Sequence, residues 1–297
     1  MTTNVTSLHT DDDQLQSRTL LQDVLYRFVR HRVGMLGASI TLLLVVLAIF
    51  GPTLAPHPPN QMNYVDQFSP PTLEYPLGTD DFGRDILSRI MYGARISLMV
   101  GAIAVGLAAT VGTVLGMAAG YGNRLADEVI MRTMDVLFAF PTILLALAVM
   151  AILGRGVSNA MIAIGIVYIP IFARIARGAT LSVKNEEFVR AAEALGGGDL
   201  HILVRHIFPN ILAPLIVETA LSLSFAILAE AALSFFGLGT QPPDPSWGRM
   251  LNEGRGFFRQ SIWMGIFPGL AIMLSVMGFN FLGDGLRDSL DPRLKNR

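Results

Sequence analysis

Cysteine is absent from the 297 residues of the chain, which excludes disulfides, thiolate metal sites and cysteine nucleophiles. Charge is also scarce, because Asp, Glu, Lys and Arg make up 15% of the residues against about a quarter in an ordinary soluble domain. Lysine occurs only at Lys184 and Lys295, and no long basic run is present, so nucleic-acid binding is not favoured. Hydrophobic residues make up 52% of the chain. This composition predicts a polytopic membrane protein rather than a soluble enzyme.

The N-terminal residues do not have the pattern of a cleaved signal peptide. Residues 1–32 contain Asp11, Asp12 and Asp13 and no apolar core, which a signal peptide requires. The uncharged run Val33–Pro56 is too long for such a core and predicts a retained first transmembrane helix. An apolar helix needs about 20 residues to cross about 30 Å of hydrocarbon. Five further runs approach this length: Ile96–Gly120, Val136–Gly154, Gly156–Ala173, Ile207–Ala229 and Gln260–Gly283.

Six spans place both termini on one side of the membrane. With the N-terminus in the cytoplasm, 15 of the 22 Lys and Arg residues fall near cytoplasmic segments and 7 near external ones. The positive-inside rule therefore predicts an all-α integral membrane protein of six transmembrane helices with both termini inside. The expected divisions are a cytoplasmic segment at 1–32, a first transmembrane helix with an external loop at 33–95, a transmembrane core at 96–286 and a cytoplasmic tail at 287–297.

The longest cytoplasmic connection contains a short amphipathic helix. We expect it over Glu186–Leu195, with Asn185 as its N-cap and two acids in the first turn, where they suit the positive helix end. Glycines at 196–198 end it. Its apolar residues share one stripe, at spacing i, i+3, i+4 and i+7: Phe188, Ala191, Ala192 and Leu195. The helix lies either on lipid headgroups or in a cleft of another protein, and its small apolar area favours the second.

This connection resembles the EAA loop of ABC-importer permeases, which has the form E-A-A-x3-G-x9-I-x-L-P. The matching residues, at full spacing, are Ala191, Ala192, Gly196 and Pro209. The departures are Arg190, His206 and Phe208, at the Glu, Ile and Leu positions. Glu187 and Glu193 are the neighbouring acids that can replace the missing glutamate.

Further stretches are similar to the C-type permease subunit of dipeptide, oligopeptide and nickel importers. Two of them, Leu77–Arg89 and Tyr92–Leu98, lie at the start of the second span. The others are Leu233–Gly239, Gln241–Pro243, Pro245–Gly248, Phe279–Asp288 and Leu290–Pro292. The resemblance thus extends from about Arg27 to Arg293, which is nearly the whole chain.

The resemblance implies a type I ABC-importer permease fold in a bacterial or archaeal cytoplasmic (inner) membrane, with a coupling loop at 180–209. It implies as partners a second homologous permease, one or two ATP-binding subunits that hold ATP and Mg, and an extracytoplasmic substrate-binding protein. The residues expected to couple to the ATPase are Glu187, Phe188, Arg190, Ala191, Ala192, Glu193, Leu195, Gly196 and Pro209. A Walker A loop needs Gly-Lys-Ser/Thr, whereas asparagine follows both lysines here. We therefore expect no ATP hydrolysis and no cofactor on this chain.

The fifth span carries two acids, Glu218 and Glu230. A charge at the bilayer centre costs roughly 3 kcal/mol, so neither is expected to face lipid. Together with Ser222 and Ser224 they are candidates for the translocation path, where a glutamate could meet a peptide amino group. The alternatives are an ion pair with an Arg of a neighbouring helix and, for the serines, hydrogen bonds to their own helix.

The external segment after the fifth span contains Trp247, Arg249 and Arg255. A tryptophan there is typical of the aromatic belt at a membrane interface. The resemblance instead implies a docking surface for the binding protein, with the arginines meeting acids on that partner. His201 and His206 are five apart, which does not fit paired helical ligands, so no metal site is expected.

The second span carries small residues at every fourth position: Ala104, Ala108, Gly112, Gly116 and Gly120. Such a face allows two membrane helices to approach closely. Packing within this chain and an interface with the second permease are both open.

Three functions compete at this point. The first is the permease subunit of an ATP-driven importer that works by alternating access, in a family whose cargoes include peptides, glutathione, nickel chelates and opines. The second is a proton-coupled secondary transporter that uses Glu218 or Glu230 and no ATPase. Such carriers are commonly built from internal repeats, and none is visible. The third, a membrane-embedded enzyme, lacks His-Glu-x-x-His and Gly-x-Ser-x-Gly motifs.

Overall fold

The computed structural model describes residues 20–290, so the ends of both predicted cytoplasmic segments, at 1–19 and 291–297, lie outside the described residues. The described residues are helical, with no sheet beyond one isolated bridge between Thr79 and Asp85. Five helices are long and apolar enough to cross a membrane. They are α2 (Arg32–Leu54), α3 (Ile86–Tyr121), α6 (Val157–Val183), α9 (Phe208–Phe235), which continues from α8 (Asp199–Ile202), and α11 (Trp263–Leu290).

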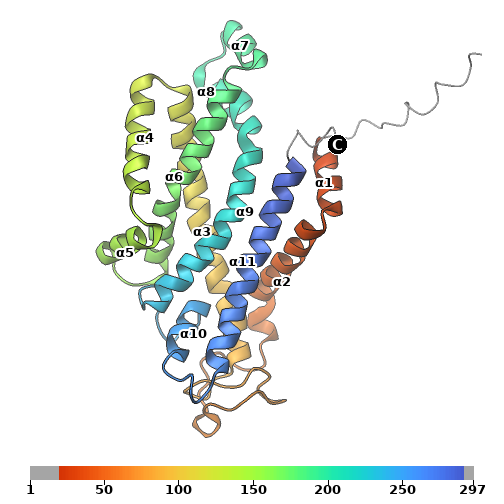
Figure 1. Cartoon of the computed structure of the whole chain (residues 1–297), viewed down its shortest axis with the longest axis vertical. Coiled ribbons are helices and arrows are strands. Elements are labelled where there is room, and N and C mark those ends of the chain that lie inside the picture. Colours follow the sequence, from red (N-terminus) through yellow and green to blue (C-terminus); the bar gives the residue numbers. More distant parts are fainter. Residues whose placement is uncertain (1–19, 291–297) are drawn as a thin grey trace, which may run out of the picture.

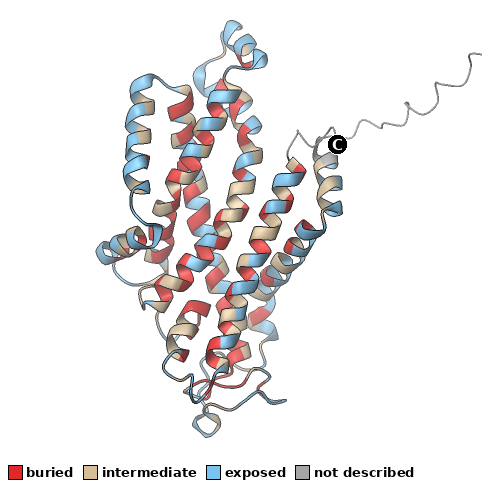
Figure 2. Ribbon diagram, viewed as in Figure 1, coloured by how far each residue is buried: buried red, intermediate tan, exposed pale blue. Residues whose placement is uncertain are grey.

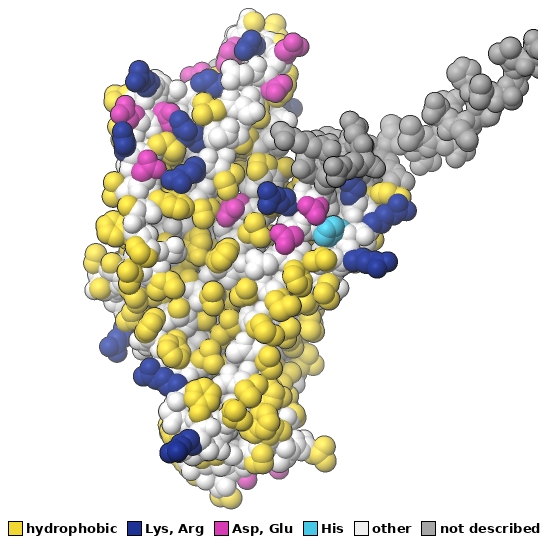
Figure 3. Space-filling model, viewed as in Figure 1, with side chains coloured by type: hydrophobic (Ala, Val, Ile, Leu, Met, Phe, Trp, Pro, Cys, Tyr) yellow, Lys and Arg dark blue, Asp and Glu magenta, His cyan; other side chains and the backbone are white. Residues whose placement is uncertain are grey.

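The long helices run side by side, and both described ends of the chain lie at one end of the bundle (Figure 1). The start of α1 (Leu20–Arg30) and the end of α11 lie near the end that carries α7 (Glu187–Ala194). The residues between α2 and α3 and the helix α10 (Trp247–Gly254) form the opposite end. Hydrophobic side chains cover the middle of the face in Figure 3, with most charges toward the α7 end. The arrangement agrees with a polytopic membrane protein whose termini share one side, which the cation distribution places in the cytoplasm.

The third predicted span, Val136–Gly154, is not one helix. The structure divides it into α4 (Arg124–Phe138) and α5 (Thr142–Leu153), which meet at an angle of 95°. Pro141 lies at the break, and a proline disfavours helical geometry at the residue before it. The structure therefore has six spans only if this bent pair is counted as one. The prediction of a straight helix was wrong here, because hydropathy carries no information on a change in helix direction.

Helix α3 packs against α6 through its glycines, which confirms the interpretation that the small-residue stripe serves contacts within this chain. A side chain on Gly112 would meet Phe172, and one on Gly120 would meet Thr180. A Cβ on Gly116 would overlap the carbonyl oxygen of Ala173. Figure 2 shows the buried residues along the central helices, α3 and α6 among them, whereas α4 is mostly exposed or intermediate. The two backbones are so close that even the Cβ of an alanine would force α3 and α6 apart.

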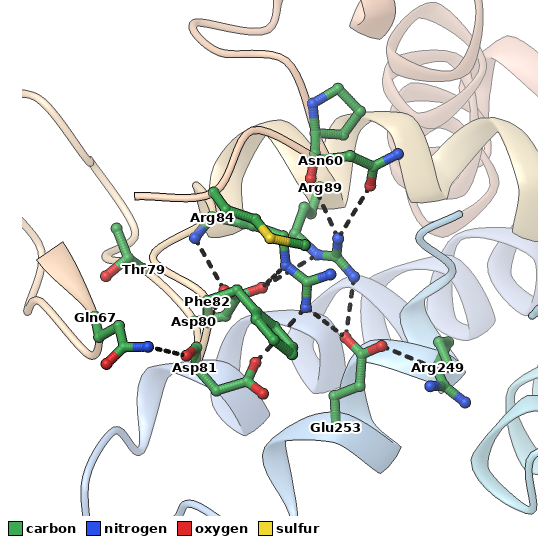
Figure 4. Close-up of polar contacts among 12 residues, drawn as sticks. Asn60, Gln67, Thr79, Asp80, Asp81, Phe82, Arg84, Arg89, Arg249 and Glu253 are labelled. Atoms are coloured by element: carbon green, nitrogen blue, oxygen red, sulfur yellow. Dashed lines mark hydrogen bonds and ion pairs between the residues drawn. The ribbon is translucent and has the colours of Figure 1, made fainter. Parts of the chain in front are cut away.

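The external end is closed by a cluster of six paired charges (Figure 4): Asp80, Asp81, Arg84, Arg89, Arg249 and Glu253. Arg84 Nε donates to Asp80 Oδ2 at 2.6 Å, and Arg89 Nη2 donates to Glu253 Oε2 at 3.0 Å. The Arg89 side chain is 1% exposed. Burial, together with the neighbouring Asp80 carboxylate, raises the pKa of Asp81 above its ordinary value. Because an unpaired buried charge is costly, the cluster holds the external loop, α3 and α10 together.

We expect Gly116→Ala to lower the free energy of unfolding by about 1–3 kcal/mol, the usual cost of overpacking. The matched control is Gly106→Ala, because Gly106 lies on the same helix with nothing within 4 Å of its added Cβ. Thermal unfolding of the two purified variants in one detergent compares them. Equal midpoints for both variants would contradict the close α3–α6 contact.

We expect Glu253→Gln to destabilise the protein by about 3 kcal/mol, because one carboxylate serves three arginines and its loss leaves buried cations with fewer partners. Glu74→Gln is the control, since Glu74 is exposed in the same external loop. Thermal unfolding and protease resistance of the external loop are the measurements. A variant as resistant as the control would show that the cluster is dispensable.

Candidate functional site

The cytoplasmic connection projects beyond the long helices at one end of the bundle (Figure 1). It begins after α6, forms α7, and returns through Gly196–Gly198 to α8 and the wide turn η2 (Leu203–Ile207), which leads into α9. Gly196 has a φ of 82°, a left-handed conformation that glycine adopts without strain. The next amide, of Gly197, donates to the carbonyl of Ala192 at 3.0 Å. The glycines thus end α7 and turn the chain back, as expected from the sequence.

Helix α7 uses one side to attach to its own chain and leaves another free. Val189 is fully buried in the main core, whereas Phe188 and Leu195 are 44% and 89% exposed. Ala191 is exposed and Ala192 is half-buried. The predicted stripe therefore faces outward at Phe188, Ala191 and Leu195. Val189, which the sequence reasoning missed, is the anchor.

The start of α7 differs from the prediction. Asn185 does not cap the helix, because its side-chain amide donates to the carbonyl of Leu181 at 2.8 Å. Glu186 occupies the N-cap position and makes no side-chain cap hydrogen bond. The helix is therefore held by its buried face rather than by a strong cap. Glu187, Arg190 and Glu193 are exposed on it.

Two residues that the sequence did not point to join the connection to the end of α3. The Tyr121 hydroxyl lies 3.2 Å from Asp199 Oδ1 and 3.4 Å from Glu193 Oε1. Lys184 Nζ donates to the carbonyls of Gly120 and Tyr121 at 3.3 and 3.4 Å. Both ends of the α7 segment are thereby tied to the same end of α3.

The wide turn η2 joins the connection to α9. It is a π-helix, in which the amide of Phe208 bonds to the carbonyl of Leu203, five residues back. Pro209 follows, and a proline has no N–H for the carbonyl four residues earlier, here Arg205. Single π-turns occur frequently at functional sites. The matched EAA-loop proline therefore lies where the helix changes its hydrogen-bonding pattern.

The candidate path residues on α9 separate into two groups. Ser222 donates to Glu218 Oε1 at 2.9 Å, and Glu218 is half-buried beside a hollow. Ser224 is buried and donates to Asn280 Oδ1 at 2.9 Å. Glu230 is 1% exposed and accepts from Ser234 at 2.7 Å and from Ser97 at 3.0 Å. Ser222, Ser224 and Glu230 are thus enclosed within this chain and Glu218 is the candidate that stays accessible. Hydroxyls rather than an arginine pair with Glu230.

The predicted external docking residues are also not equivalent. Trp247 is 1% exposed and its Nε1 donates to the carbonyl of Ile90 at 3.1 Å, so its assignment to a docking surface or an interfacial belt is wrong. Its ring lies against Gly93, where no side chain intervenes. Arg249 belongs to the ion cluster through Glu253. Arg255 is exposed, with its guanidinium 5.5 Å from the centre of the Phe235 ring.

Curated relatives match nearly the whole chain. The dipeptide transport system permease protein DppC of Alkalihalophilus pseudofirmus is 45% identical over 96% of this chain and 94% of its own length. The glutathione transport system permease protein GsiD of Escherichia coli O157:H7 is 46% identical over 94% of this chain and 93% of its own length. A solved structure of the methionine ABC transporter MetNI in an inward-facing conformation matches with a TM-score of 0.56 and 16% identity, over 67% of this chain and 94% of that one. That likeness supports the fold.

Two family descriptions cover most of the sequence. Residues 112–296 match the binding-protein-dependent transport system inner membrane component, and residues 19–71 match the N-terminal TM domain of oligopeptide transport permease C. The second match includes α1 and α2, and the first includes the α7 connection, α9 and α11. The chain therefore belongs to the family of inner membrane components of binding-protein-dependent transport systems, as a C-type permease subunit of an ABC importer.

Proposed function

We propose that this chain forms part of the translocation pore for di- and oligopeptides or similar small peptide-like solutes, which a binding protein delivers from outside. The observation that carries the proposal is α7, a helix anchored by Val189 that projects from the bundle and exposes Phe188 and Leu195. The substrate class is supported by relatives named for dipeptide and glutathione transport. The coupling loop at 180–209 is the part that serves the energy source.

The exposed side of α7 docks, in this proposal, into a separate ATP-binding subunit that holds ATP and Mg. Apolar side chains that are left exposed among the described residues, such as Phe188 and Leu195, suit a hydrophobic cleft on a partner. Closure of the ATPases displaces α7, and the displacement reaches α3 through Tyr121 and Lys184 and α9 through η2. ATP binding then biases the pore between inward-open and outward-open states. The proton-coupled alternative receives no support from the relatives.

The proposed assembly contains a second homologous permease, one or two ATP-binding subunits and an external binding protein. Arg255 is the exposed member of the candidate docking residues. Affinity purification of the tagged chain from native membranes, followed by mass spectrometry, tests the assembly. Recovery of the permease and Walker A subunits near 1:1 supports it, and a lone chain that transports in liposomes without ATP refutes it.

We expect Ala191→Glu to abolish ATP-dependent peptide uptake while the protein still folds, because Ala191 is exposed on α7 and a charge there opposes entry into an apolar cleft. Leu125→Glu is the control, because it adds the same charge at another exposed site, in the first turn of α4 and four residues after Tyr121. Uptake and substrate-stimulated ATPase activity are measured in proteoliposomes. Normal transport by Ala191→Glu would refute the role of α7.

We expect Tyr121→Phe to lower the peptide transported per ATP hydrolysed several-fold, because the ring stays while the hydroxyl contact with Asp199 and Glu193 is lost. Stability should change little, since an exposed hydrogen bond contributes about 1 kcal/mol or less. Tyr64→Phe removes a hydroxyl from an exposed external tyrosine and is the matched control. An unchanged transport-to-ATP ratio would show that Tyr121 transmits nothing.

A further inference from the structure

A hollow of about 600 Å³ lies where α6, α9 and α11 diverge. One face of α9 lines it, at the helical spacing i, i+3, i+4, i+7, i+8 and i+11: Asn210, Ala213, Pro214, Val217, Glu218 and Leu221. Ile175 of α6 with Arg287 and Leu290 of α11 complete the wall. Volumes of about 300–1,000 Å³ are usual for sites that bind small molecules. Most of this wall is apolar, and it carries one acidic side chain, Glu218, and one basic side chain, Arg287.

The negative side of the hollow is Glu218. Its carboxylate accepts one described side-chain hydrogen bond, from Ser222, so it has capacity for further donors. Nearby, Pro214 has no N–H, so the carbonyl of Asn210 lacks its usual helical donor. Glu218 and Asn210 both line the hollow. A carboxylate and a free carbonyl on one helix face together suit an ammonium group.

The positive side is Arg287, in the last turn of α11. It is exposed, and among residues 20–290 no ion pair involves it. A guanidinium presents paired N–H donors that match a carboxylate. The hollow therefore offers separate partners for an ammonium and for a carboxylate, with apolar walls that include Val217 and Leu221.

We propose that this hollow binds short peptides with free termini during passage, with Glu218 and the Asn210 carbonyl at the amino end and Arg287 at the carboxylate. The inference rests on the proposed function and adds a selection step in the permease itself. The binding protein is then not the only component that recognises a zwitterion.

The test uses the complete importer in nanodiscs, without its binding protein, and a dipeptide of alanine and diazirine-bearing photoleucine as the probe. Competitors are alanyl-alanine, its N-acetyl form and its C-terminal amide. For the wild type, we expect the label on peptides of α9 or α11 and about tenfold weaker competition by either blocked form, the scale of one charge-assisted contact. Label confined to other helices overturns the proposal.

Two variants distinguish the ends of the peptide. Glu218→Gln should lose the discrimination against the N-acetyl form and keep that against the amide, and Arg287→Gln should do the reverse. If Glu218 and Arg287 only stabilised the fold, the two variants would not lose discrimination against different ends of the peptide. Asp284→Asn and Arg132→Gln, at exposed sites outside the hollow, should leave both discriminations unchanged. Equal losses in all four variants, or none in any, refute the assignment.

Access to the hollow is tested with a single thiol. Because the chain has no cysteine, Val217→Cys gives this permease one reactive sulfur, whose reaction with a maleimide is located by mass spectrometry. Reaction is expected in the nucleotide-free importer. Protection in every nucleotide state would show that the second permease fills the hollow, which overturns the proposal.

Uptake measured with the binding protein present distinguishes failure of the proposed peptide site in the hollow from failure of the proposed transport function. The measurement is ATP-dependent uptake of di- and tripeptides by the complete importer in proteoliposomes. No uptake refutes the proposed function, whereas normal uptake without crossed discrimination refutes only the binding site.

Discussion

The close packing of α3 against α6 is the contact on which the rest of the structure depends. Lipid offers no hydrophobic driving force between helices, so close van der Waals packing must supply it, and the glycines of α3 allow that approach. Helix α3 has 36 residues, which corresponds to about 54 Å at 1.5 Å per residue. Its start carries Asp85 and Arg89 at the external end, and its last residue, Tyr121, contacts the coupling connection. One helix, packed against α6 between Ala104 and Gly120, therefore connects the two ends of the molecule.

The polar groups follow from this geometry. At the external end, buried arginines and carboxylates neutralise one another and hold the loop 55–85 against α10, an arrangement that is stable only with every partner present. At the cytoplasmic end the contacts that tie the α7 connection to Tyr121 are exposed and individually weak, whereas Arg177 of α6 holds Asp127 of α4 through two hydrogen bonds. The external end thus resists deformation, while the α7 connection is held less firmly. Such a difference suits a pore whose energy arrives from one side.

The sequence predicted the membrane class, five of the spans and the position of the short helix α7, because each depends on local pattern. Its errors have long-range causes. Trp247 is buried because Gly93, far away in the chain, leaves room for its ring. Val189 is the anchor of α7 because it reaches the main core, although the apolar stripe lies on another side. Neither the tie of Tyr121 to Asp199 nor the ion pairs of Glu253 with Arg84 and Arg89 leave a local signal, since these partners are distant in sequence.

The break between α4 and α5 has a consequence for what surrounds this subunit. It lies at mid-height of the bundle, beside exposed Phe138 and Phe140, and the backbone there leaves the helical hydrogen-bonding pattern. Irregular backbone at membrane depth is tolerated only where protein covers it or water reaches it. Within this chain the amides of Ala139 and Phe140 donate to the carbonyls of Asp135 and Leu137, and the carbonyl of Pro141 accepts from Leu145. The carbonyls of residues 138–140 are the groups that need such cover. The flank along α4 and α5 is therefore the part of the described surface where we expect protein or water rather than lipid.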